Sequence, residues 1–205
     1  MRRNVRILGV LLGVAACQQG AEQAEPPATA AESTPAPAPV PGSPEAKIAE
    51  ALSAAPAEIA GGAAIMDWPA TEGGEMTELR AGGNGWTCFP NSPAAVTAAV
   101  DDPMCLDETW LAFANAWMTR TEPQITKVGF GYMMQGDAGS SATDPFAMSE
   151  TADNQWVRSG PHMMVVVPDP KALEGLPTTP ESGGPWVMWA GTAWAHIMAP
   201  VPVQR

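Results

Sequence analysis

A stretch rich in alanine and proline, from Gln18 to about Pro44, limits how much of this 205-residue chain can fold. It has almost no branched or aromatic side chains, so it cannot bury enough apolar surface to offset the entropy lost on ordering. We predict that residues 17–60 form a disordered tether that ends in a marginal short helix, interrupted by Pro56. The remaining residues, 61–205, suffice for a single globular domain.

The chain begins with a basic segment and an apolar run that ends at Val14-Ala15-Ala16-Cys17. This arrangement resembles the signal peptide and lipobox of bacterial lipoprotein precursors, which are cut before the cysteine and diacylated on it. The apolar run has about half of the roughly 20 residues that a membrane-spanning helix needs. The resemblance therefore implies removal of residues 1–16 and lipidation of Cys17. Because Gln18 rather than Asp follows the cysteine, it also implies an outer-membrane anchor that faces the periplasm.

The net charge of the chain is strongly negative, at −12 with 10 basic and 22 acidic residues. Removal of residues 1–16 takes away three arginines and no acidic residue, which leaves 7 basic residues and a charge of −15. Such a surface repels phosphate backbones and anionic lipid headgroups. We therefore expect no nucleic-acid partner, and we expect the membrane to be contacted through the acyl chains alone.

The pattern of apolar residues predicts an α+β domain with a mostly antiparallel sheet and one main helix, over about residues 107–120. Asp107 is expected to cap this helix, Trp110 lies on its apolar face, and Pro123 prevents its continuation.

Apolar and alternating runs predict strands on both sides of the helix. The expected strands are 63–68, 78–80, 86–89, 125–134, 162–167, 186–189 and 194–201. The Gly-rich segment 81–85 predicts a hairpin between the strands that flank it. The short connection 190–193 predicts an antiparallel hairpin between the last two strands, since parallel neighbours need a longer crossover.

Two of the three cysteines, Cys88 and Cys105, remain once Cys17 is assigned to the lipid. In an oxidising compartment we expect them to form a disulfide that stabilises the domain by about 3 kcal/mol. The alternative, a redox-active dithiol, lacks the Cys-x-x-Cys spacing that lowers a thiol pKa.

The two histidines of the chain each precede a methionine by two positions, His162 with Met164 and His196 with Met198. On a strand, residues with this spacing project from the same face. Imidazole and thioether donors suit Cu(I), and the His-x-Met spacing is similar to a motif of periplasmic copper chaperones. The competing interpretation is that the methionines fill the core and the histidines make structural hydrogen bonds. The sequence leaves both interpretations open.

The loop over residues 135–145 is dense in small polar residues and follows an expected strand. Its Asp137 and Asp144 are candidate Ca²⁺ ligands, although their spacing matches no EF-hand loop and Asx turns explain them equally well. Its Ser140 and Ser141 are candidate nucleophiles if a histidine lies beside them, but no Gly-x-Ser-x-Gly motif surrounds them.

Three tryptophans near the C-terminus, Trp186, Trp189 and Trp194, are candidates for an aromatic binding platform. Trp186 and Trp189 are an odd number of residues apart, so a regular strand would expose one of them. The alternative is a Trp-rich core.

Four segments of the domain stand out by their Gly, Trp and Met content: Asn84 to Pro90, Tyr132 to Asp137, Ser159 to His162 and Gly183 to Trp189. They resemble those of a bacterial family of exported proteins that has no assigned activity. We therefore expect a lipid-anchored envelope protein whose domain binds a small molecule, a cation or another envelope protein without catalysis. The alternatives are a periplasmic Cu(I)-handling protein and a hydrolase centred on the 135–145 loop.

Overall fold

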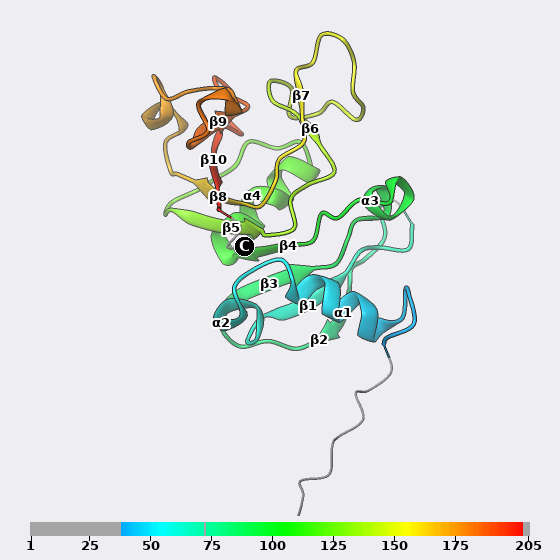
Figure 1. The fold of residues 1–205 in the computed structure, drawn as a ribbon. Helices are drawn as coiled ribbons and strands as arrows, with labels where there is room; N and C mark the ends of the chain where they lie inside the picture. The colour runs from blue at the N-terminus through cyan, green and yellow to red at the C-terminus, as the bar shows by residue number, and fades with distance from the viewer. Residues whose placement is uncertain (1–37, 72, 203–205) are drawn as a thin grey trace, which may run out of the picture. The chain divides into compact units, whose positions relative to one another are not determined.

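The computed structural model describes residues 38–202 except residue 72 (Figure 1). The expected signal peptide, the lipidated Cys17 and most of the expected tether lie outside the described residues, so they stay predictions. Among the helices that are described, none is long and apolar enough to cross a membrane.

An eight-stranded sheet runs through the described part of the chain (Figure 1). Its strands lie in the order β2 (Thr77–Arg80), β1 (Ala64–Asp67), β3 (Trp86–Phe89), β4 (Met104–Asp107), β5 (Gly129–Met133), β8 (His162–Val166), β10 (His196–Pro200) and β9 (Trp186–Met188). All neighbours are antiparallel except β1 and β3. The predicted α+β class with a mostly antiparallel sheet is confirmed, as is the hairpin between the last two strands.

The predicted hairpin between residues 78–80 and 86–89 is wrong, because β1 lies between β2 and β3 and pairs with both. The Gly-rich segment 81–85 is hydrogen-bonded to residues that precede β1. Gly83 N donates to Gly62 O at 3.0 Å, and the Asn84 side chain donates to Ile59 O at 2.8 Å. These bonds hold the segment against the chain just before β1. The segment therefore passes over the start of β1 to connect β2 with β3, and it does not form a tight hairpin turn.

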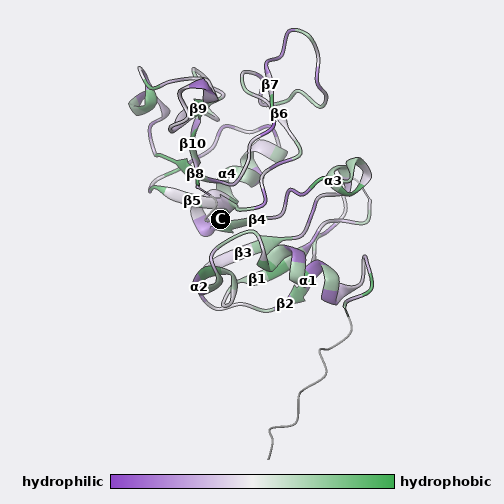
Figure 2. Cartoon of the chain, viewed as in Figure 1, coloured by the Kyte–Doolittle hydropathy of each residue, from purple (hydrophilic) through white to green (hydrophobic). Residues whose placement is uncertain are grey.

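Two short helices precede the sheet, α1 (Pro44–Leu52) and α2 (Ala57–Ala60), with the expected break at Pro56. Ser43 caps α1, and Figure 2 shows both hydrophobic and hydrophilic stretches along this helix. Contrary to expectation, the helices belong to the domain and not to the tether. Their alanines pack with the disulfide-bonded cysteines against one face of the sheet, in a cluster that contains Ala51, Ala54, Ala55, Ala60, Ala63, Ile65, Cys88 and Cys105.

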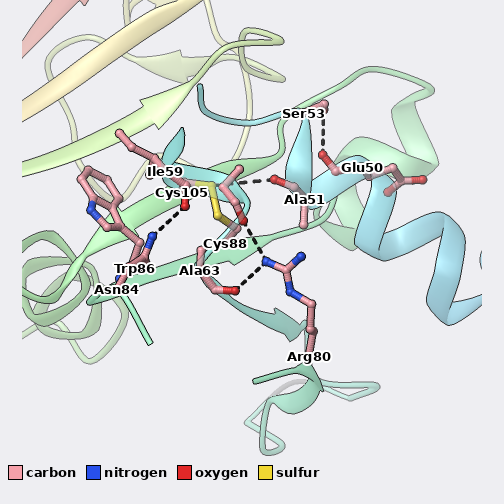
Figure 3. Close-up of a disulfide and its surroundings, with 11 residues drawn as sticks. Glu50, Ala51, Ser53, Ile59, Ala63, Arg80, Asn84, Trp86, Cys88 and Cys105 are labelled. Atoms are coloured by element: carbon pink, nitrogen blue, oxygen red, sulfur yellow. Dashed lines mark hydrogen bonds between the residues drawn. A yellow bond between two sulfur atoms is a disulfide. The ribbon is translucent and has the colours of Figure 1, made fainter. Parts of the chain in front are cut away.

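The disulfide between Cys88 and Cys105 is confirmed. The two residues are directly opposite each other in the β3–β4 pairing, so the bridge staples neighbouring strands under α1 (Figure 3). Beside it, the Arg80 guanidinium donates to Ala60 O at 2.8 Å and to Ala63 O at 2.7 Å, which joins β2 to the chain that leaves α2.

The main helix, α4 (Glu108–Met118), covers the opposite face of the sheet. Asp107 caps it as predicted, accepting a 2.7 Å hydrogen bond from Trp110 N. Because successive strand residues point to opposite faces, Cys105 packs beneath α1 whereas Leu106 packs in the core that contains Trp110 and Phe113 of α4.

Shorter elements connect these parts: α3 (Pro93–Ala98), β6 (Ser140–Ser141), β7 (Trp156–Val157), η1 (Pro170–Leu173) and η2 (Pro180–Ser182). Neither α3 nor β4 was expected from the sequence. β6 and β7 pair with each other and carry the predicted 135–145 loop outward from the main sheet (Figure 1).

Candidate ligand-binding pocket

A pocket of about 250 Å³ lies between α4 and the face of the sheet that α4 covers. Its walls are mostly apolar, and both histidines of the chain line it. Methionine is the most frequent lining residue, contributed by Met104, Met133, Met164, Met188 and Met198. We call this cavity the methionine pocket.

The strand register explains why these residues meet. His162, Met164 and Val166 alternate along β8 and therefore share a face. On one side of β8, Met133 of β5 is directly opposite His162. On the other side, Met198 of β10 is directly opposite Met164. The sheet thus places three thioether side chains around the start of β8.

His162 is 2% exposed, and its Nδ1 lies 2.8 Å from the carbonyl oxygen of Gly160. A carbonyl oxygen only accepts hydrogen bonds, so Nδ1 carries the proton and Nε2 carries a lone pair. This Nε2 is buried and has no hydrogen-bond partner among the described residues. Burial lowers the pKa of His162, while the bond to Gly160 and the charge of Asp137 act in the opposite direction.

His196 is also 2% exposed, and its Nδ1 lies 3.0 Å from Trp194 O. Three aromatic rings surround its imidazole, with centroid distances of 5.1 Å to Trp110, 5.7 Å to Phe113 and 4.9 Å to Trp189. Burial lowers the pKa of His196 to about 4. The ring is therefore neutral at neutral pH, held by one hydrogen bond and by aromatic packing.

The four residues that the sequence marked as metal ligands all line the methionine pocket, and they come from two neighbouring strands, β8 and β10. Ile197 pairs with Val165, so His196 faces Val166, four residues along β8 from His162. At about 3.3 Å per residue, the two histidine backbones are separated by roughly 13 Å along the strand. The Met164–Met198 pair lies between them. The histidine rings still interact, because the charge of His162 acts with burial to lower the pKa of His196.

Two carboxylates line the end of the pocket near His162. Asp102 is 7% exposed and accepts hydrogen bonds from Ser92 N at 2.7 Å and Ser92 Oγ at 2.6 Å; burial raises its pKa. Asp137 Oδ1 accepts from Gly139 N at 2.9 Å and Ser159 N at 3.0 Å. These acidic groups give this end of the pocket a negative potential that favours a cation.

Asp144 and Ser141, two of the loop residues expected to bind calcium or to catalyse, make hydrogen bonds within the fold. Asp144 caps its own turn by accepting from Phe146 N at 2.9 Å. Ser141 is completely buried, and its Oγ donates to Asn154 O at 2.6 Å and accepts from Asp144 N at 2.8 Å. Ser140 lines the pocket, yet neither serine hydroxyl is hydrogen-bonded to a histidine in the described part of the chain.

In the described ranges, no group of three or more His, Cys, Asp or Glu side chains is placed to hold a metal ion. Asp137 and Asp144, the expected calcium ligands, each accept a hydrogen bond from a backbone amide of their own loop. A metal in the methionine pocket would have to use thioether sulfur among its ligands.

For Trp186 and Trp189 the alternative interpretation, a Trp-rich core, is the one that the structure supports, and neither is exposed. Trp186 is 2% exposed and Trp189 is 7% exposed. Strand alternation does not apply to Trp189, because it follows β9 with a φ of 56° and turns back into the core. There it stacks on Trp117 at 5.9 Å and donates to Ser141 O at 2.8 Å. Trp194 is half-buried and packs against Phe146.

The sequence did not single out three of the five pocket methionines, Met104, Met133 and Met188. Met133 stands at the end of an expected strand, in a Met-Met pair like the one that follows His162. That local similarity was the available signal, but only the pairing of β5 with β8 shows that Met133 is opposite His162.

The wall of the pocket depends on close packing of Trp110 against Gly131 of β5. A Cβ atom at position 131 would overlap the indole ring of Trp110. We expect Gly131→Ala to lower the free energy of unfolding by about 2 kcal/mol, since overpacking a well-packed core costs about 1–3 kcal/mol. Chemical denaturation of wild type and variant measures the loss. The matched control is Gly83→Ala, because Gly83 has no atom within 4 Å of an added Cβ. Equal stability of the two variants would contradict this packing.

Comparisons with protein-family models, with curated proteins and with solved structures found no match to this chain. The resemblance to exported proteins of unassigned activity therefore stays a prediction. It depends only on the sequence segments 84–90, 132–137, 159–162 and 183–189.

Proposed function

We propose that this protein is a lipid-anchored envelope protein whose domain binds a small ligand in the methionine pocket without transforming it. The observation that carries the proposal is the convergence of both histidines, distant in sequence, with five methionines on one pocket beneath α4. Ligand sites are typically concave and mostly apolar, with a few polar groups that orient the ligand. The unpaired Nε2 of His162 is such a polar group.

Binding is favoured over catalysis by the state of the polar side chains near the pocket. The Ser141 hydroxyl is occupied by backbone bonds, and Asp102 and Asp137 accept from backbone amides. A nucleophilic mechanism needs a hydroxyl or thiol hydrogen-bonded to a base. Among the described residues, neither histidine is hydrogen-bonded to a hydroxyl or thiol. The Ser92 hydroxyl donates to the Asp102 carboxylate, but it also caps α3 by accepting from Ala95 N. Methionine side chains, in contrast, adapt readily to a bound ligand.

The envelope location is supported by two features of the cysteines. The Cys88–Cys105 disulfide is typical of proteins that fold in an oxidising compartment. The lipobox-like sequence before Cys17 accounts for export and for an anchor in the membrane. The acidic surface also supports attachment through acyl chains and not through protein–lipid charge contacts.

Ligand access to the pocket is testable with indole as the probe, since indole is apolar and carries one N–H donor that suits the free Nε2 of His162. We expect indole to shift the methyl resonances of the pocket methionines in protein labelled with ¹³C-methyl methionine. Met148, which is 86% exposed, serves as the internal control and should not move. Shifts confined to Met148, or none at all, would contradict the proposal.

A pair of variants on α4 sharpens this measurement. Ala114 lines the pocket, whereas Ala112 on the same helix is exposed. Ala114→Phe should fill the cavity and abolish the indole shifts, while Ala112→Phe adds the same ring outside the pocket and should leave them unchanged. If both variants bind indole equally well, the probe occupies some other place.

A further inference from the structure

We propose that the ligand is Cu(I), held at the His162 end of the methionine pocket by the Nε2 of His162 and the thioethers of Met133 and Met164. This inference rests on the proposed function, that the methionine pocket is a ligand site. It differs from the site expected from the sequence, because it uses a methionine from a third strand and leaves out His196.

The strand pairing places these three side chains within reach of one ion. Met133 and His162 are directly opposite each other across β5 and β8, where backbones are about 5 Å apart. Met164 is two residues beyond His162 on the same face, at about 7 Å. All three line the pocket, and Met198 lies opposite Met164 as a further thioether beside the site.

The hydrogen bonding of His162 suits a metal ligand. Metal-bound histidines generally donate their other ring N–H to a carboxylate or a backbone carbonyl, which fixes the tautomer and the ring orientation. His162 Nδ1 donates in this way to Gly160 O at 2.8 Å. Its Nε2 is consequently an acceptor, and it is buried without a partner among the described residues. A buried acceptor without a partner costs about 1–3 kcal/mol, and a bound ion would supply the missing interaction.

The donor chemistry selects Cu(I) among the common metals. Thioether sulfur is a soft donor that prefers Cu(I), whereas calcium needs oxygen ligands and structural zinc needs thiolates, imidazoles or carboxylates in larger number. The described residues supply no such cluster of His, Cys, Asp and Glu. The carboxylates of Asp102 and Asp137 near this end of the pocket favour a positive ion without serving as its ligands.

His196 is assigned a supporting role because of its surroundings. Its imidazole is enclosed by Trp110, Phe113 and Trp189, and it stands roughly 13 Å along the strands from His162. It therefore closes the aromatic end of the pocket.

The experiment measures Cu(I) affinity by competition with bathocuproine disulfonate, without oxygen and with ascorbate as the reductant, so that the Cys88–Cys105 disulfide stays intact. The purified full chain carries Cys17→Ser, which removes the remaining thiol. We expect binding of one Cu(I) per chain, with an X-ray absorption spectrum that shows nitrogen and sulfur ligands. Zn²⁺ and Ca²⁺ should not compete.

Substitutions separate the ligands from their neighbours. His162→Gln and the double variant Met133→Leu with Met164→Leu should each weaken Cu(I) binding at least about 100-fold. Loss of a group that only supports a metal ligand costs up to about 100-fold in affinity, and loss of the ligand itself should cost at least as much. The double variant keeps side-chain volume and so keeps the fold. Met148→Leu, at an exposed methionine outside the pocket, should bind within a few-fold of wild type. Near-ultraviolet circular dichroism confirms that each variant is folded.

The possible outcomes separate this inference from the proposed function. Indole binding without tight Cu(I) binding overturns the copper inference but agrees with the proposed function as a ligand-binding domain. Failure of both probes overturns both. If His196→Gln abolishes Cu(I) binding while the double methionine variant does not, then the ion binds at His196, and Met133 and Met164 are not its ligands.

Discussion

Replacing both Cys88 and Cys105 with alanine is expected to lower the free energy of unfolding by about 3 kcal/mol. The bridge joins residues 17 apart in sequence, and loss of a loop of that size restores this much conformational entropy to the unfolded chain. Urea denaturation of the oxidised wild type and of the double variant measures the difference. Reduced wild type should fall to the stability of the variant, and the variant itself should not respond to reductant.

A loss below about 1 kcal/mol would contradict this expectation, because it would mean that packing alone holds β3 to β4. The surroundings of the bridge argue otherwise. The side chains packed on it from α1 and α2 are mainly alanines, which bury little apolar area each. The larger apolar residues, including Trp110 and Trp186, lie in the core on the opposite face. The disulfide thus stabilises the face that has the smaller hydrophobic contribution.

The same variant should leave the methionine pocket intact. Cys105 faces α1, while its neighbour Leu106 lines the pocket on the other face of β4. The methionine methyl spectrum and its response to indole should therefore match those of wild type under conditions in which the variant is folded.

Features set by local chemistry could be predicted from the sequence. Asp107 caps α4 because its carboxylate reaches the first free amides of the helix, and Pro56 separates α1 from α2 because it lacks an amide hydrogen. The disulfide followed from the number of cysteines and the expected compartment. The strands that contain the His-x-Met pairs were recognisable as short apolar runs.

Features set by long-range pairing could not be predicted. Whether β3 pairs with β2 or with β1 depends on where the segment around Asn84 is held, and its partner Ile59 is 25 residues away. β4 is a strand of four residues between Pro103 and α4, too short to show alternation. The register of β5 against β8, which places Met133 beside His162, is likewise a property of the assembled sheet.

Replacing Cys17 with serine is expected to abolish palmitate incorporation and to remove the protein from the outer-membrane fraction. The proposed anchor is the acyl-modified sulfur, which serine cannot provide, and the helices of the described domain include none that could span a bilayer. The acidic chain should also gain no attachment from charge, since it repels anionic headgroups. Fractionation after metabolic labelling with radioactive palmitate measures both the location and the modification.

A second substitution tests the sorting step separately. In Gln18→Asp the lipidated cysteine is retained, so palmitate labelling should persist while the protein shifts from the outer to the inner membrane on a density gradient. Because the pocket and the packing that stabilise the domain are formed by residues 38–202, indole binding and stability should not change. If Cys17→Ser stays in the outer membrane, or if wild type incorporates no palmitate, then some other part of the chain attaches the protein. The disulfide would in that case be the sole remaining support for an envelope location.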